Sequence, residues 1–271
     1  MNITHMSVSR KSVWDQCQLC YKYKYHLEIP SPEEEPYYFV YGKIVHKIAE
    51  EYVKNKGTIK LGQIAGDVIQ GRLTLERDDA AGTKPPPLPA DYREKLPVHL
   101  RAVQHITSQL GFEGLLEHPF YYDLDGQGRH VKGFIDRLIP MKKNHFFILD
   151  YKTSKKNSFR KNSSNIAKDL QLRMYARIVQ KEFDVPPENI YAALYYLEGA
   201  EMVSARFCQR SLLEAESEML EAYKQVQHTQ ADNARAKVGN HCSRCDYRSI
   251  CPLMRSKNHA DVSSVSPYLL G

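Results

Sequence analysis

Apolar residues recur at helical spacing in several parts of the chain. In 42–56 they follow one another every three or four positions, which predicts a helix with one buried face. Ser9 opens the segment 9–25, which predicts a short helix followed by an extended aromatic stretch. The same periodicity predicts further helices over 60–78, 91–110, 164–182 and 211–228.

Shorter segments carry the patterns of strands. Residues 120–124 and 130–138 flank a glycine-rich turn and predict two strands around it. Residues 145–152 contain a four-residue apolar run, typical of a strand covered on both faces. Later strands are predicted over 191–197 and, at a sheet edge, over 202–208. Helices precede, separate and follow the strands, so the predicted fold class is α/β, with a mixed sheet and helices on both faces.

Composition narrows the class of protein. The 271 residues are 42% hydrophobic and 26% charged, which is enough apolar material for a core. No apolar run approaches the roughly 20 residues that span a bilayer, and the N-terminus has no secretory signal pattern. We therefore expect a cytoplasmic protein in a reducing compartment, with no membrane partner. The formal charge of +6 suits a polyanionic partner but is too mild to establish one.

Charged residues end the predicted strand 145–152. Asp150 and Lys152 are two residues apart and therefore project to one face of that strand. Asp136 lies in the preceding strand, and a short connection allows antiparallel pairing, so Asp136 and Asp150 can converge on one cation. Such oxygen ligands suit Mg²⁺ or Mn²⁺, and a neighbouring ammonium can orient the attacking water. Alone, the Asp150–Lys152 pair is more often a solvated ion pair.

Four motifs, in order along the chain, resemble those of the PD-(D/E)XK nuclease superfamily, specifically its RecB-like branch. They are Gly42–His46, Val131–Asp136, Leu149–Thr153 and Asp169–Tyr175. The resemblance implies a restriction-endonuclease-like core and a nuclease that hydrolyses phosphodiester bonds with a bound metal.

The same resemblance implies roles for individual residues. Metal ligation falls to His46, Asp136, Asp150 and the carbonyl of Tyr151, and catalysis to Asp136 and Asp150 together with Lys152, Gln171 and Tyr175. Helical spacing agrees with the role of His46, because Gly42, His46 and Glu50 share one helix face. Gly42 leaves room on that face for close approach of backbone or substrate. Glu117 is equally consistent with a supporting carboxylate beside the metal and with an ordinary surface residue.

Cysteine spacing suggests a second metal centre. Cys242, Cys245 and Cys251 lie within ten residues, and Cys17 or Cys20 is a fourth candidate far upstream. Four thiolates can hold zinc or an iron-sulfur cluster, and their spacing alone does not distinguish the two. The remaining cysteine, Cys208, is expected to be free.

The cysteine pattern also resembles that of iron-sulfur PD-(D/E)XK nucleases, including AddB-type subunits and CRISPR-associated exonucleases. The resemblance implies a 4Fe-4S cluster that joins segments 1–25 and 235–256, with Cys17 as the N-terminal ligand beside Cys242, Cys245 and Cys251. Cys20 is close enough to Cys17 to compete for that position.

Basic residues follow the predicted catalytic strand in a loop where they can contact phosphates: Lys155, Lys156, Arg160 and Lys161. An ordinary solvated loop is an equal alternative. The aromatic and basic residues of 21–25 can stack on unpaired bases, although packing beneath the cluster is favoured.

The resulting hypothesis is a single domain over 1–271, with a helical insertion at 57–110. We expect a Mg²⁺- or Mn²⁺-dependent DNA exonuclease that acts on single-stranded or frayed ends in recombination, repair or CRISPR adaptation, an antiviral defence. A helicase or a CRISPR integrase is an expected protein partner. The alternative is a catalytically inactive iron-sulfur or zinc module that binds DNA for a partner enzyme.

Overall fold

The structure is a computed structural model that describes residues 1–75, 84–154 and 160–254. The predicted phosphate contacts of Lys155 and Lys156 lie outside the described residues. Within the described part, no helix is long and apolar enough to cross a membrane.

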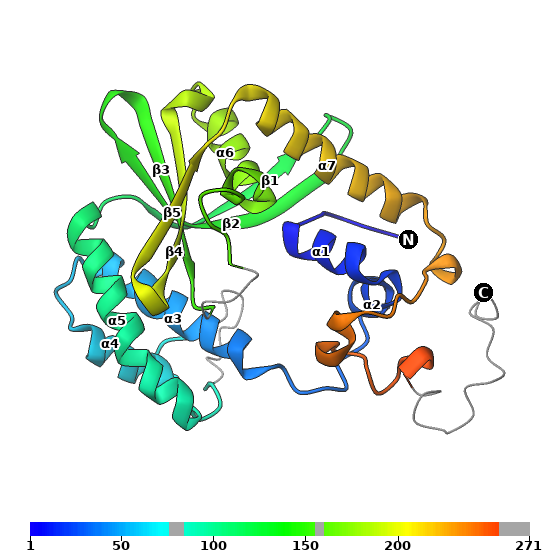
Figure 1. Cartoon of the computed structure of the whole chain (residues 1–271), viewed down its shortest axis with the longest axis horizontal. Coiled ribbons are helices and arrows are strands. Elements are labelled where there is room, and N and C mark those ends of the chain that lie inside the picture. Colours follow the sequence, from blue (N-terminus) through cyan, green and yellow to red (C-terminus); the bar gives the residue numbers. More distant parts are fainter. Residues whose placement is uncertain (76–83, 155–159, 255–271) are drawn as a thin grey trace. The chain divides into compact units, whose positions relative to one another are not determined.

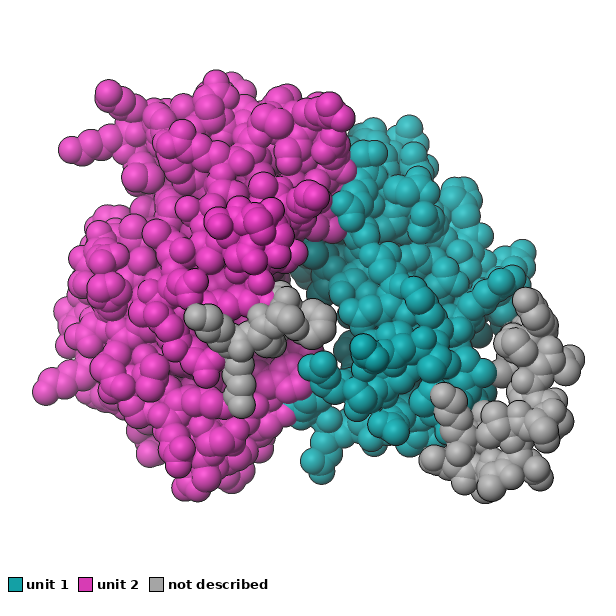
Figure 2. Space-filling view, viewed as in Figure 1, with its two compact units in different colours: residues 1–36, 121–133, 216–271 teal, residues 37–120, 134–215 magenta. Residues whose placement is uncertain are grey.

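The chain divides into two compact units, coloured separately in Figure 2. Unit 1 comprises residues 1–36, 121–133 and 216–271, and unit 2 comprises 37–120 and 134–215. All candidate ligands and catalytic residues of the nuclease site belong to unit 2, and the five candidate cluster cysteines belong to unit 1. The single-domain interpretation stays a prediction.

A five-stranded sheet has its strands in sequence order, β1 to β5 (Figure 1). The pair β2/β3 is antiparallel, with Arg137 opposite Leu149, whereas β3/β4 is parallel and β4/β5 is antiparallel. The sheet is therefore mixed, which confirms the predicted α/β class. The strands are β1 (Leu115–Asp123), β2 (His130–Met141), β3 (His145–Lys152), β4 (Ile190–Tyr196) and β5 (Glu201–Arg206).

Helices of unit 2 cover both faces of this sheet. Helices α3 (Tyr37–Lys54), α4 (Leu61–Ile69) and α5 (Ala90–Leu110) share one apolar core with residues of β3 and β4. The core residues of β3 are Leu149 and Tyr151, so the alternation of the strand turns Asp150 and Lys152 to the opposite face. Helix α6 (Leu170–Glu182) packs against β3 and β4 on that opposite face.

Two helices start five or six residues away from the predicted positions. Helix α3 begins at Tyr37 rather than at 42, because Tyr37 and Tyr41 pack against Tyr92 of α5 with ring centroids 5.0 and 4.7 Å apart. Helix α6 begins at Leu170 rather than at 164, because the carboxylate of Asp169 caps it by accepting a hydrogen bond from the Leu172 amide at 3.0 Å.

The aromatic segment of unit 1 is helical, so the predicted extended stretch is wrong. Helix α1 (Val8–Gln16) is followed by α2 (Gln18–Tyr21) and a π-helical turn, Lys22–His26. Tyr21 packs against Trp14 and Tyr25, with ring centroids 5.3 and 5.0 Å apart. Tyr21 and Tyr25 are four positions apart and meet on one helical face, whereas Trp14 contacts Tyr21 from α1. Both contacts favour the helical conformation over the strand preference of tyrosine. Unit 1 also contains most of the last long helix, α7 (Gln209–His228).

Candidate active site

Asp150 and Lys152 form an ion pair at the end of β3. Their Oδ2 and Nζ atoms are 2.6 Å apart, as expected for residues that share one face of a strand. Asp150 is almost fully buried, at 1% exposure, whereas the Lys152 side chain is 31% exposed. The carboxylate is therefore held within the protein, whereas part of the Lys152 side chain is accessible.

The antiparallel register of β2 and β3 places Asp136 beside Asp150. Arg137 lies opposite Leu149, and one further step along both antiparallel strands brings Asp136 opposite Asp150. The backbone amide of Tyr151 donates a hydrogen bond to Asp136 Oδ2 at 2.9 Å. The backbone of β3 thus fixes the orientation of the Asp136 carboxylate.

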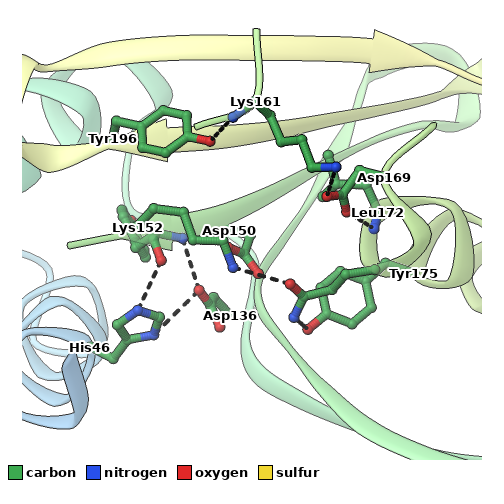
Figure 3. Close-up of polar contacts among 11 residues, drawn as sticks. His46, Asp136, Asp150, Lys152, Lys161, Asp169, Leu172, Tyr175 and Tyr196 are labelled. Atoms are coloured by element: carbon green, nitrogen blue, oxygen red, sulfur yellow. Dashed lines mark hydrogen bonds and ion pairs between the residues drawn. The ribbon is translucent and has the colours of Figure 1, made fainter. Parts of the chain in front are cut away.

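His46 of α3 lies between two candidate ligand atoms (Figure 3). Its Nδ1 is 3.3 Å from Asp136 Oδ2, and its Nε2 is 2.9 Å from the carbonyl oxygen of Tyr151. Burial lowers the pKa of His46, but the carboxylates of Asp136 and Asp150 outweigh burial and raise it. The protonated ring has a donor for each of its two partners, which agrees with that direction.

Glu117 of β1 contributes a further carboxylate to this site. One ligand atom each of His46, Glu117 and Asp136 lies within 4.8 Å of the others. The backbone of Glu117 has a φ of +47°, in the left-handed region that non-glycine residues rarely adopt. Observed strain of this kind gathers at functional sites, so Glu117 belongs with the candidate ligands. The sequence had left its role undecided.

A hydrogen-bonded chain links Lys152 to α6. Lys152 Nζ donates to Gln171 Oε1 at 3.1 Å, and Gln171 Nε2 donates to the Tyr175 hydroxyl at 2.7 Å. Gln171 and Tyr175 are one helical turn apart, which places both side chains on the face of α6 turned to β3. These contacts hold the ammonium at a fixed point beside Asp150.

The buried charges perturb one another. Burial raises the pKa of Asp150 to about 6, although the Lys152 ammonium opposes this shift. Burial also opposes ionisation of Asp136, yet the charge of His46 keeps its pKa below the usual value. For Lys152, burial is outweighed by Asp150 and Asp136, so its pKa is raised and it remains an ammonium at neutral pH. With a pKa of about 6, Asp150 is largely ionised at neutral pH, and a bound cation would favour its ionised form further.

The described basic residues after β3 already have partners within unit 2. The guanidinium of Arg160 lies 3.8 Å from the centroid of the Tyr196 ring and 3.0 Å from Glu201. Lys161 Nζ is 3.8 Å from Asp169 Oδ2. The predicted contacts of Arg160 and Lys161 with DNA phosphates stay predictions.

Gly42 lies one turn before His46 on α3. A Cβ at this position would be 3.7 Å from the Thr153 hydroxyl oxygen, an ordinary van der Waals distance. Packing within the protein therefore does not require the room that the sequence interpretation ascribed to this glycine.

A separate pocket in unit 1 is lined by cysteines. Its walls include Cys17, Cys242, Cys245 and Cys251, together with apolar and basic residues, among them Lys237, Val238, Arg248, Leu253 and Met254. Cys17 has an extended backbone between α1 and α2, and the Leu19 amide next to it donates to the Arg235 carbonyl at 3.1 Å. This bond holds the N-terminal segment beside the C-terminal cysteines.

Backbone amides point at the C-terminal cysteines. The Gly239 amide lies 3.4 Å from Cys242 Sγ. Burial raises the pKa of Cys251, although the amides of Leu253 and Met254 favour its thiolate. Hydrogen bonds from amides to sulfur are a feature of metal-bound thiolates.

Cys20 lies beside the same group of thiols. Its Sγ is 4.0 Å from Cys245 Sγ, and the hydrogen bond between the two thiols lowers the pKa of Cys245 to about 6. Of the two N-terminal cysteines, the one that lines the described pocket is Cys17. Cys208, outside unit 1, is free and exposed.

Comparison with known proteins identifies the class to which this fold and site belong. The sequence model of the PD-(D/E)XK nuclease superfamily matches residues 5–252. The chain belongs to the PD-(D/E)XK nuclease superfamily. None of the curated proteins compared with the chain matches it in sequence.

A solved structure has a similar fold. A protein from Eubacterium rectale, described as a "putative exonuclease", is 14% identical, with a TM-score of 0.55 over 97% of this chain and 91% of its own. The protein SSO0001, also of known structure, is 14% identical over 88% of this chain and 95% of its own, with a TM-score of 0.38.

Proposed function

We propose that the protein is a Mg²⁺- or Mn²⁺-dependent deoxyribonuclease that removes nucleotides from single-stranded or frayed DNA ends. One observation carries this proposal: the buried Asp150–Lys152 pair adjoins a group of His46, Glu117 and Asp136 with ligand atoms within 4.8 Å of one another. Membership of the nuclease superfamily supports the reaction class. The excess of basic residues suits a polyanionic substrate.

The donor set fits a hard divalent cation. Carboxylate oxygens of Glu117 and Asp136 and one nitrogen of His46 lie together and suit Mg²⁺ or Mn²⁺. The Tyr151 carbonyl beside His46 and the Asp150 carboxylate opposite Asp136 are the further proposed ligands. Bound there, the cation would lower the pKa of a coordinated water and polarise a phosphate oxygen. Lys152, held by Gln171, would orient the attacking water and neutralise charge that develops on the phosphate. Tyr175 would keep the Gln171 amide in its orientation.

The test is digestion of DNA labelled at one end, single-stranded and double-stranded, with Mg²⁺ or Mn²⁺. Linear single strands should be shortened progressively, whereas a circular single strand of the same composition should persist because it offers no end. Absence of cleavage with either metal would contradict the nuclease proposal, and equal cleavage of the circle would contradict the preference for ends.

Replacing Lys152 should separate substrate binding from cleavage. We expect Lys152→Ala to bind Mn²⁺ and DNA while cleavage falls by roughly 10²-fold or more, since an ammonium is no ligand for a cation. Lys152→Arg should fail as well, because a planar guanidinium cannot occupy the place of a compact ammonium between Asp150 and Gln171. Single-turnover cleavage and fluorescence anisotropy measure the two properties. An active arginine variant would mean that positive charge alone suffices.

Replacing Glu117 tests its place among the metal ligands. Glu117→Gln keeps the size of the side chain but removes its charge, so Mn²⁺ affinity should fall by roughly 10-fold to 100-fold in isothermal titration calorimetry. The matched control is Glu113→Gln, whose side chain is 80% exposed and ion-paired with Lys56 at 3.8 Å. Equal Mn²⁺ affinity of the two variants would remove Glu117 from the ligand set.

We also propose that the cysteine pocket of unit 1 holds a 4Fe-4S cluster. Four cysteines line one pocket, and the basic residues Lys237 and Arg248 in the same lining suit the negative charge of a thiolate-bound cluster. Amide donors beside Cys242 and Cys251 fit the same assignment. Zinc is the competing occupant, and metal analysis of anaerobically purified protein distinguishes the two by iron content and colour.

A further inference from the structure

An exposed aromatic pair occupies the first turn of α3. Phe39 is 51% exposed and Tyr38 is 39% exposed, and their ring centroids are 4.4 Å apart with an interplanar angle of 38°. Their neighbours Tyr37 and Tyr41 instead pack against Tyr92 of α5. Tyr37 and Tyr41 thus provide the aromatic packing between α3 and α5, whereas Tyr38 and Phe39 remain outside the core.

Phe39 lies on the same helix face as His46. The two residues are seven positions apart, which is close to two full turns, so their side chains project in nearly the same direction. The opposite face of α3 carries the core residues, including Ile44, Ile48 and Tyr52. An exposed phenylalanine therefore stands in the polar face that bears the candidate metal ligand.

The distance along α3 between Phe39 and His46 suits a bound single strand of DNA. Seven residues of α-helix rise about 10.5 Å, and stacked nucleotides of one strand are spaced by about 3.4 Å. A strand whose phosphate lies at the His46 end can thus present a base to Phe39 within about two to four nucleotides. Thr153, which follows Lys152, lies next to the intervening turn, 3.7 Å from where a Gly42 Cβ would be.

We propose that Phe39, braced by Tyr38, is a stacking platform for an unpaired base of the DNA strand being cleaved. Every base has an aromatic face, so stacking binds single strands without reading their sequence, whereas a base within a duplex is already stacked. The platform would therefore favour single-stranded or frayed ends. This inference rests on the proposed nuclease function and adds a positioning residue for its substrate.

The test combines variants of Phe39 with substrates that lack one base. Phe39→Ala and Phe39→Leu should raise KM for a single-stranded oligonucleotide roughly tenfold and leave kcat within about twofold, whereas Phe39→Trp should restore KM. For the wild type, one abasic position within four nucleotides of the cleaved bond should raise KM by a similar factor. That abasic position should add no further penalty in Phe39→Ala, because both changes remove one contact.

Met202→Ala is the control, because Met202 is 47% exposed on β5 and should leave KM unchanged. An unchanged KM in Phe39→Ala, or a full abasic penalty in that variant at every position, would overturn the inference while the nuclease proposal stands. Anisotropy of a labelled oligonucleotide without metal gives a second readout. A wild type that binds the oligonucleotide through Phe39 but never cleaves it would contradict the proposed function alone.

Discussion

Asp150→Asn is expected to lower the rate of DNA cleavage by roughly 10³-fold or more while leaving the fold intact, which corresponds to about 4 kcal/mol of barrier. Asp150 is buried, its Oδ2 is 2.6 Å from Lys152 Nζ, and it lies opposite Asp136 in the antiparallel register of β2 and β3. The amide of asparagine keeps the shape of the side chain but loses the charge that a cation requires. Single-turnover cleavage at saturating Mn²⁺ measures the effect.

The matched control for this substitution is Asp91→Asn. Asp91 lies in the first turn of α5, its side chain is 60% exposed, and it pairs with Lys95 at 3.6 Å. Its replacement should leave the cleavage rate within about twofold, because surface ion pairs contribute little. If Asp150→Asn retained a tenth of the wild-type rate, Asp150 would not be a metal ligand.

Loss of one cluster ligand is expected to produce the largest change in stability. Cys17 precedes Cys242 by 225 positions, so a cluster that joins them closes most of the chain into a loop. By analogy with a disulfide, this constraint stabilises the fold by about 5 kcal/mol. Cys17→Ala should therefore bleach the visible absorption near 400 nm and lower the melting temperature, with a smaller indirect loss of cleavage. Absorption spectra and thermal unfolding of anaerobic protein measure both effects.

Two cysteine variants serve as controls for the cluster. Cys208→Ala replaces an exposed thiol outside unit 1 and should stay coloured. Cys20→Ala should also stay coloured, since Cys17 lines the pocket, although Cys20 Sγ is 4.0 Å from Cys245 Sγ. A colourless Cys20→Ala beside a coloured Cys17→Ala would move the N-terminal ligand to Cys20. A wild type that is colourless and holds stoichiometric zinc would replace the iron-sulfur assignment.

Substitutions in the nuclease site and in the cysteine pocket are expected to have opposite effects, so each site can be tested separately. Asp150 lies in unit 2 and Cys17 in unit 1. Asp150→Asn should keep colour and melting temperature and lose cleavage, whereas Cys17→Ala should lose colour and stability first. If either variant lost both cleavage and colour to a similar extent, the cluster pocket and the nuclease site would depend on one another.

The sequence by itself determined the α/β class of the fold and most residues of the candidate nuclease site. Alternation along β3 put Asp150 and Lys152 on one face, and the short connection between β2 and β3 predicted their antiparallel pairing. Helical spacing put Gln171 and Tyr175 one turn apart on α6. These features depend on the strand period of two residues and the helix period of 3.6 residues. Both periods are local, so they can be recognised in the amino-acid sequence alone.

Only the tertiary structure decided which groups meet across elements. Glu117 joins His46 and Asp136 because β1, α3 and β2 converge, and no local pattern marks that carboxylate. Residues 22–26 form a helical turn and α3 begins at Tyr37 because aromatic rings find partners in other elements. Tyr37 and Phe39 are both aromatic and lie two residues apart in the sequence. The Tyr37 ring packs against Tyr92 of α5, whereas the Phe39 ring remains exposed. Contacts between residues distant in the chain set these outcomes, because burial depends on which surfaces the fold brings together.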